Sequence, residues 1–241
     1  MNIILNLYKK WEYFFPRGCS ICRINLFNKE EILYGLCHNC RKNIIFDKSL
    51  RCKYCGRPLI SEVDQCLTCR INAETEKPLF DRMFSVFPYN GKYIKLLSAF
   101  KYEKSLGAGQ FLSEHMIKAI YILDKDLNQD FVLVPVPPRP GKIRKIGWDQ
   151  IITLSHLISQ RPDTPKIYQC LERKASLTQK KLDRKDRKTN LEGRIIAFKK
   201  PPQNCILFDD VITTGSTMNA CANALKQAGA QIIHGICLFY D

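Results

Sequence analysis

Eight of the twelve cysteines stand before residue 70, and they form four Cys-x2-Cys pairs. The pairs are Cys19 with Cys22, Cys37 with Cys40, Cys52 with Cys55, and Cys66 with Cys69. Each such turn brings two thiolates to one metal ion, and two turns complete a tetrahedral zinc site with Zn–S distances of about 2.3 Å. Four thiolates leave no open position for substrate, so we expect two structural zinc ions. We expect ligation in chain order, with an interleaved cross-brace as the alternative; an iron–sulfur or redox role is the alternative to zinc.

The remaining four cysteines stand singly in apolar segments, without partners at metal-ligand spacing. They are Cys170, Cys205, Cys221 and Cys237, and we interpret them as small core residues. His38 lies inside a Cys-x2-Cys turn and is predicted to be an exposed turn residue, since four thiols are already available. Reduced cysteines in a chain without a recognisable signal peptide or long apolar span predict a cytoplasmic protein with no membrane insertion.

A second chemical motif, ILFDDVITTGST, runs from Ile206 to Thr217. An apolar strand ends in Asp209 and Asp210, and a short Thr/Gly turn then opens a helix. Backbone N–H groups of that turn, its hydroxyls and the positive helix terminus suit a single phosphate group. The two carboxylates can accept hydrogen bonds from neighbouring sugar hydroxyls. The motif therefore predicts a phosphorylated sugar at the carboxyl end of a parallel strand.

The formal net charge is +15, and it is unevenly distributed. Residues 139–200 contain 17 Lys or Arg against 6 Asp or Glu, which leaves a net charge of +11 in that segment. Eight of these cations lie between Arg173 and Lys188, more than one small anion needs. A polyanionic ligand is predicted, with a solvated lysine-rich surface as the alternative. Trp148 and Tyr54 are predicted to offer stacking surfaces for bases.

Apolar runs of strand and helix type alternate after residue 78 and predict a parallel sheet with helices on both faces. The expected strands are residues 83–89, 131–136, 166–171, 204–208 and 232–240, and the expected helices are residues 2–15, 93–100, 111–123, 150–158 and 216–228. We predict two domains. Residues 1–80 form an N-terminal helix and double zinc ribbon, and residues 81–241 form the α/β domain.

These motifs resemble those of a known family. The run Asp209-Asp210-x-x-Thr213-Thr214-Gly215-x-Thr217 is similar to the phosphoribosyl pyrophosphate (PRPP) motif of type I phosphoribosyltransferases. The whole chain resembles the ComF family, including ComFC and GntX-like proteins, through the cysteine pairs, residues 134–137, residues 147–150, residues 179–190 and the PRPP motif. The resemblance implies a small zinc-ribbon domain followed by a type I phosphoribosyltransferase-like parallel sheet flanked by helices, with PRPP and Mg²⁺ as ligands.

The same resemblance implies roles for individual residues. Asp209 and Asp210 would hold the ribose hydroxyls and, together with Arg173, would be the catalytic residues. The turn that contains Val136 and Arg139 would bind the pyrophosphate, and residues 173–190 would form a loop that closes over the site. The 5′-phosphate would be bound by Thr213, Thr214, Gly215, Ser216 and Thr217.

Two positions depart from the family pattern. Ile146 stands where family members usually have an arginine before Gly147, and Thr213 stands where purine-type enzymes have an acidic general base. A threonine cannot abstract a proton near neutral pH, so purine salvage is disfavoured. The favoured function is a cytoplasmic ComF-type competence factor for the uptake of transforming single-stranded DNA, which binds PRPP with Mg²⁺ and contacts either the single-stranded DNA or the DNA-uptake machinery. An active phosphoribosyltransferase with an unidentified acceptor and a zinc-ribbon interaction module are the alternatives.

Overall fold

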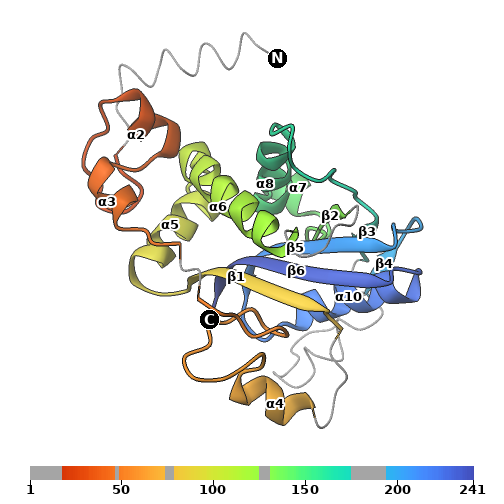
Figure 1. The fold of residues 1–241 in the computed structure, drawn as a ribbon. Coiled ribbons are helices and arrows are strands. Elements are labelled where there is room, and N and C mark those ends of the chain that lie inside the picture. The colour runs from red at the N-terminus through yellow and green to blue at the C-terminus, as the bar shows by residue number, and fades with distance from the viewer. Residues whose placement is uncertain (1–17, 47–48, 74–78, 125–130, 175–193) are drawn as a thin grey trace, which may run out of the picture. The chain divides into compact units, whose positions relative to one another are not determined.

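A computed structural model describes residues 18–46, 49–73, 79–124, 131–174 and 194–241 (Figure 1). The expected helix over residues 2–15 and most of the expected closing loop lie outside the described residues. The chain divides into two compact units, one containing residues up to Ile45 together with Asn90–Leu112, and one containing Phe46–Tyr89 and Ser113–Asp241. The first cysteine group belongs to the former unit and the second to the latter. The predicted domain boundary after residue 80 stays a prediction.

The second unit is built on a four-stranded parallel sheet. Its strands are β1 (Arg82–Pro88), β2 (Val132–Pro135), β5 (Asn204–Ile212) and β6 (Ile232–Tyr240), in the order β1-β6-β5-β2. The neighbouring strands pair in parallel throughout. The central strands are apolar and buried along most of their length, as expected for a sheet covered on both faces. The predicted parallel α/β sheet is confirmed.

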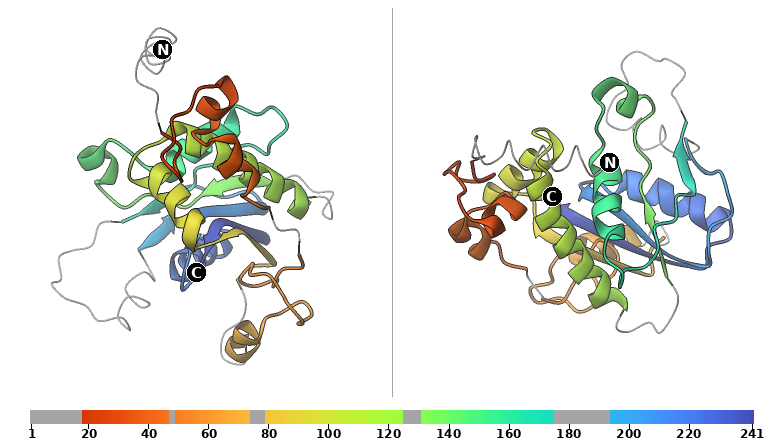
Figure 2. Two further views of the ribbon diagram at one scale, coloured as in Figure 1. Left: turned by 90° about the vertical axis from the view of Figure 1, so that its left-hand side faces the viewer. Right: turned by 90° about the horizontal axis from the view of Figure 1, so that it is seen from above.

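Helices α8 (Gln150–Ser159) and α10 (Ser216–Gln227) lie on opposite faces of this sheet (Figures 1 and 2). Cys221 and Leu225 of α10 share one buried cluster with Cys205 and Leu207 of β5. Side chains of a strand alternate between its two faces. The odd-numbered residues of this part of β5 therefore face α10, and the even-numbered ones face α8.

The first unit contains α2 (Lys29–Tyr34), α3 (His38–Lys42), α5 (Gly91–Lys101) and the start of α6 (Leu106–Asp124). Gly107 and Gly35 pack so closely that a Cβ on Gly107 would lie 2.5 Å from the backbone nitrogen of Gly35. Arg23 donates two hydrogen bonds to the Glu103 carboxylate, at 2.8 and 2.5 Å. Glycine packing and this ion pair hold the first cysteine-rich segment against the helices of its own unit.

The second cysteine-rich segment, which includes α4 (Leu67–Ala73), lies against the outer edge of β1. The Ser85 amide donates to the Gly56 carbonyl at 3.2 Å, and the Ser85 hydroxyl donates to the Cys55 carbonyl at 3.3 Å. Gly56 has a φ of +72°, and a Cβ there would lie 2.7 Å from the Ser85 nitrogen. Glycine is therefore required at position 56 both for its backbone conformation and for the close approach to β1.

The structure differs from the expected elements in several places, including helix α6, which begins at Leu106 and not at residue 111. The predicted strand over residues 166–171 is wrong in extent, because only Ile167 bridges to Leu133 of β2 before the chain leaves the sheet. The chain then forms β3 (Leu171–Arg173), which pairs antiparallel with β4 (Ile195–Ala197). Strand β5 continues to Ile212, because its last residues pair with β6. A short helix, α7 (Lys142–Ile146), was not expected from the sequence.

Candidate functional site

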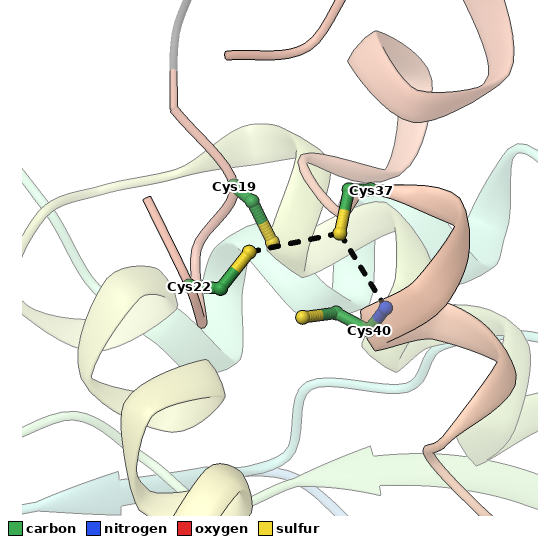
Figure 3. A group of neighbouring side chains, drawn as sticks. All are labelled: Cys19, Cys22, Cys37 and Cys40. Atoms are coloured by element: carbon green, nitrogen blue, oxygen red, sulfur yellow. Dashed lines mark hydrogen bonds between the residues drawn. The ribbon is translucent and has the colours of Figure 1, made fainter. Parts of the chain in front are cut away.

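The sulfurs of each cysteine quartet come together in the order predicted from the sequence. The ligand atoms of Cys19, Cys22, Cys37 and Cys40 lie within 4.8 Å of one another, as do those of Cys52, Cys55, Cys66 and Cys69. Figure 3 shows the sulfurs of the first quartet pointing toward one another. The Cys22–Cys37 and Cys55–Cys66 sulfur pairs are each 3.7 Å apart, close to the edge of about 3.8 Å that Zn–S bonds of about 2.3 Å give a tetrahedron. The two quartets fit two structural zinc sites, and the cross-brace alternative is wrong.

The turns around each quartet are shaped by backbone hydrogen bonds. The Gly56 amide donates to the Cys52 carbonyl at 2.9 Å, which closes the second knuckle. Cys37 caps helix α3, and its sulfur accepts a hydrogen bond from the Cys40 amide at 3.4 Å. His38 is exposed and is not among the convergent ligand atoms, as predicted. Local turn geometry thus presents each pair of sulfurs to a common centre.

Within a quartet the thiols compete for protons. A hydrogen bond from Cys55 lowers the pKa of Cys52 to about 4, while Cys52 in turn raises the pKa of Cys55. Burial raises the pKa of Cys69 to about 12. Four thiols this close together cannot all be ionised without a compensating cation. A divalent metal ion stabilises all four thiolates and offsets their mutual repulsion. The electrostatics therefore agree with the geometry in assigning a metal to the group.

The acidic pair lies in the last third of β5, and its two carboxylates have different surroundings. Asp210 faces α8, where its Oδ2 accepts a hydrogen bond from Gln150 Nε2 at 2.9 Å. Asp209 faces α10, and its negative charge raises the pKa of Arg173 against the larger effect of burial. Both side chains are buried. Because consecutive strand residues alternate between faces, the motif divides its two carboxylates between the two sides of the sheet.

The Thr/Gly turn connects β5 to α10 as the sequence predicts. Gly215 caps the helix with a φ of +74°, and the Asn219 amide donates to its carbonyl at 2.8 Å. The hydroxyls of Thr214 and Ser216 lie 2.9 Å apart. Thr213 and Thr214 are exposed, and Thr217 is half-buried. The turn therefore presents hydroxyls beside the positive end of a twelve-residue helix, where anions bind favourably.

Cationic side chains gather at a hollow beside this edge of the sheet. The hollow has a volume of about 650 Å³. It is lined by residues 137–141, Ile143, Arg144 and residues 171–173. Burial lowers the pKa of Arg173, and the nearby positive charge of Arg139 lowers it further. The half-buried Arg173 and the exposed Arg139 repel each other, and an anion bound between them would relieve that repulsion.

Val136 contributes differently from the other residues expected in the pyrophosphate loop. It is buried, and its amide donates to the Phe208 carbonyl at 3.1 Å. That N–H group is therefore used to extend the pairing of β2 with β5. Arg139, three residues later, is exposed and lines the hollow.

Two groups of side chains, one at the site and one at residues 166–168 and 198–200, were not expected from the sequence. The first is a hydrogen-bonded chain from Lys142 through Gln150 to Asp210. The second is an aromatic and basic cluster in which the Lys199 ammonium lies 4.1 Å from the ring centroid of Tyr168 and 5.7 Å from that of Phe198. Phe198 is 53% exposed. Interleaved aromatic and basic residues over 166–168 and 198–200 were the available signal for the cluster.

The predicted stacking residues Trp148 and Tyr54 are both half-buried. Tyr54 packs against the apolar cluster around Cys52 and Leu59. The basic residues from Lys180 to Lys188 lie outside the described residues.

A family model for the double zinc ribbon domain matches residues 11–72. Competence protein F of Haemophilus influenzae is 29% identical over 232 residues, which cover 91% of this chain and 95% of that protein. The chain is a relative of the ComF proteins. Competence protein ComFC of Bacillus subtilis is 26% identical and covers 80% of this chain and 79% of its own length. DNA utilization protein YhgH of Escherichia coli K12 is 24% identical over 92% of this chain and 96% of its own length.

The predicted resemblance to the ComF family is thus confirmed over almost the whole chain.

Among solved structures, a hypoxanthine-guanine phosphoribosyltransferase from Bacillus anthracis aligns with 54% of this chain and 69% of its own, at a TM-score of 0.35 and 10% identity. A hypoxanthine phosphoribosyltransferase from Staphylococcus aureus aligns at a TM-score of 0.34 and 14% identity, over 55% of this chain and 63% of its own. Among the described residues, no helix is both long and apolar enough to traverse a bilayer.

Proposed function

We propose that this chain is a cytoplasmic competence factor of the ComF type, which binds PRPP with Mg²⁺ and supports the uptake of transforming single-stranded DNA. The observation that carries the proposal is the meeting of three features at one edge of the sheet. These are the acidic pair of β5, the hydroxyl-bearing start of α10 and the hollow that contains Arg139 and Arg173. A sugar with a phosphate at one end and a pyrophosphate at the other needs carboxylates between two anion sites.

The proposal gives each part of the site one task. Asp209 and Asp210 accept hydrogen bonds from the ribose hydroxyls, and residues 213–217 bind the 5′-phosphate. Arg139 and Arg173 neutralise the pyrophosphate, and Mg²⁺ supplies further positive charge when it is bound with the ligand. The charge of the hollow and the composition of the turn support these assignments.

Replacement of either carboxylate is expected to weaken PRPP binding about ten- to a hundredfold. Each of Asp209→Ala and Asp210→Ala removes a charged acceptor, which costs about 1.5 to 3 kcal/mol. Titration calorimetry with PRPP and Mg²⁺ measures the change, and the magnesium-free comparison is made by omission because a chelator would also remove zinc. Asp163→Ala, on an exposed loop, is the matched control and should bind like the unchanged protein. Wild-type affinity in both acidic-pair variants contradicts the ribose contacts.

Single-stranded DNA is the polyanion that best explains the remaining basic surface. Lys199 and Lys200 are exposed beside Phe198, and Lys166 is exposed near Tyr168. Exposed aromatic rings stack on bases without regard to sequence, while lysines follow the phosphate backbone. The relatives named for competence and DNA utilization support the same partner.

Oligonucleotide binding should weaken as the salt concentration rises, and two kinds of variant should distinguish the contribution of charge from that of base stacking. If about five phosphates are engaged, log K falls against log salt with a slope of about −3.5. Replacing Lys180, Lys181, Arg184 and Lys185 by Ala flattens that slope for all sequences alike. Phe198→Ala weakens binding about five- to a hundredfold, for a stacking loss of about 1 to 3 kcal/mol, and leaves the slope unchanged.

A fluorescent oligonucleotide titrated at several salt concentrations measures both effects. Ile152→Ala, which removes another exposed apolar side chain of the same unit, is the control for Phe198. An unchanged slope in the charge variant, or no binding at low salt, would leave PRPP as the one polyanion of the proposal.

An active phosphoribosyltransferase is the second candidate, because the same pocket serves enzymes and binding proteins alike. Thr213 in place of an acidic residue favours an acceptor that needs no general base at that position. Pyrophosphate release from PRPP in the presence of nucleobases, nucleosides or DNA distinguishes the candidates. Turnover supports the enzyme, and binding without turnover supports the competence factor.

A further inference from the structure

A chain of polar side chains connects helix α7 with the acidic pair. Lys142 Nζ lies 2.7 Å from Asp149 Oδ2 and also donates to Gln150 Oε1. Gln150 Nε2 then donates to Asp210 Oδ2 at 2.9 Å. Asp149, Gln150 and Asp210 are 5%, 8% and 5% exposed. Such a fully paired polar chain in the interior holds its members in fixed orientations.

The chemistry of the groups fixes the direction of the Gln150 amide. An ammonium group can only donate hydrogen bonds, so Lys142 must face the amide oxygen of Gln150. That leaves the amide NH₂ to face the Asp210 carboxylate, which can only accept. In the reversed orientation the amide NH₂ would face the Lys142 ammonium and the amide oxygen would face the Asp210 carboxylate. Lys142 therefore determines which end of Gln150 meets Asp210.

Helix α8 anchors the chain. Asp149 Oδ1 accepts from the amides of Ile151 and Ile152 at 2.9 and 3.1 Å, and so caps the helix. Its other oxygen is thereby aimed at Lys142. Helix α7, which carries Lys142, is flanked by Gly141 and Gly147, whose φ angles are +73° and +67°. Arg144 of the same helix lines the cationic hollow.

We propose that Gln150 and Lys142 are positioning residues that set the orientation of the Asp210 carboxylate and connect it to the α7 wall of the cationic hollow. The inference rests on the proposed binding of PRPP, and it assigns the two carboxylates unequal roles. Asp210 is oriented by this polar chain, whereas Asp209, on the opposite face of the sheet, accepts at its Oδ1 from the Asp210 backbone amide at 2.8 Å.

The test is a pair of double-mutant cycles read by PRPP–Mg²⁺ affinity. Gln150→Leu is expected to weaken binding about tenfold, because Asp210 keeps the Val211 amide, which donates to its Oδ1 at 3.0 Å, and loses the donor to its Oδ2. In the cycle with Asp210→Asn, the double variant should bind PRPP no more weakly than the weaker-binding single variant, since both substitutions remove the same interaction. In the cycle with Asp209→Asn the two fold-losses should multiply.

Ser155→Ala is the control for packing loss on the same helix. Ser155 is buried one turn further on and donates to the Ile151 carbonyl at 2.7 Å, so its loss should lower stability without changing affinity. Lys142→Met should weaken PRPP binding as Gln150→Leu does, and the fold-losses of the two substitutions should not multiply in the double variant. Fold-losses that multiply for Gln150 with Asp210, or an unchanged affinity in Gln150→Leu, overturn the proposal.

A second measurement keeps the inference testable if the wild-type protein binds no PRPP, an outcome that overturns the proposed function. The same two cycles are then read from the midpoint of urea unfolding. The double variant Gln150→Leu/Asp210→Asn should lose less in its unfolding midpoint than the sum of the losses of the two single variants. For Gln150→Leu with Asp209→Asn, the loss of the double variant should equal that sum. Additive losses in the first cycle overturn the positioning role by themselves.

Discussion

The purified protein is expected to contain two zinc ions per chain, each contributing on the order of 10 kcal/mol or more to the folding of its own cysteine-rich segment. Metal binding is coupled to folding here, since the apolar cluster around the second quartet consists mainly of the ligand cysteines themselves, with Leu59 and Tyr54. Cys52→Ser should lower the content to one zinc ion and leave the second cysteine-rich segment disordered. Metal analysis by mass spectrometry gives the stoichiometry, and limited proteolysis reports on the segment.

Cys205→Ser is the matched control for this substitution. Cys205 is also a fully buried cysteine, but it stands in β5 and its sulfur contacts the Pro202 carbonyl at 3.3 Å. A serine there should leave two zinc ions per chain. A wild-type content near zero or one, or a full content in Cys52→Ser, contradicts the assignment of two independent sites.

Acid should destabilise the sheet through His234. This side chain is 2% exposed, and neither of its ring nitrogens has a hydrogen-bond partner among the described residues. Burial lowers its pKa from 6.5 to about 4, so the folded protein resists protonation that the unfolded chain accepts. The contribution of His234 to the free energy of unfolding should therefore be fully present above pH 6.5, and it should fall by about 2 to 3 kcal/mol as the pH approaches 4.

Urea unfolding at a series of pH values, with His234→Phe as the variant, isolates this contribution. The His234 ring lies 5.0 Å from that of Phe131 at an angle of 31°, so a phenylalanine keeps the ring contact and removes the titrating group. The variant should lose stability less steeply between pH 6.5 and pH 4. His156→Gln, at an exposed position of α8, should follow the wild-type curve. Identical slopes in all three proteins would refute the role of His234.

Local patterns were sufficient to predict much of this fold. The Cys-x2-Cys spacings predicted both metal groups, because the ligands of each site are close in the chain. The strand over residues 232–240 matches β6, and the helix expected over 216–228 matches α10 within one residue. In each case a long apolar period and a clear stop signal, such as Gly229 after α10, coincide.

What could not be predicted depends on contacts between distant residues. Strands β3 and β4 are three residues each and pair across an interval of more than twenty residues, so neither has a detectable period of its own. Gln150 and Asp210 are 60 positions apart, and no local signal connects them. The opposite orientation of Asp209 and Asp210 follows from strand alternation once β5 is known to continue to Ile212, which its pairing with β6 determines.

The contact between Gly56 and β1 has a consequence for how the protein behaves in a crowded cell. β1 is an outermost strand of its sheet, and the Gly56 carbonyl occupies the Ser85 amide that would otherwise face outward. Arg57, the next residue, also donates to the Asp241 carbonyl at 2.7 Å. An uncovered edge strand is a template on which other chains add and aggregate. A zinc ion bound by the second quartet would hold this segment in shape and so protect the edge of the sheet from self-association, and we expect zinc starvation to make the chain prone to aggregation.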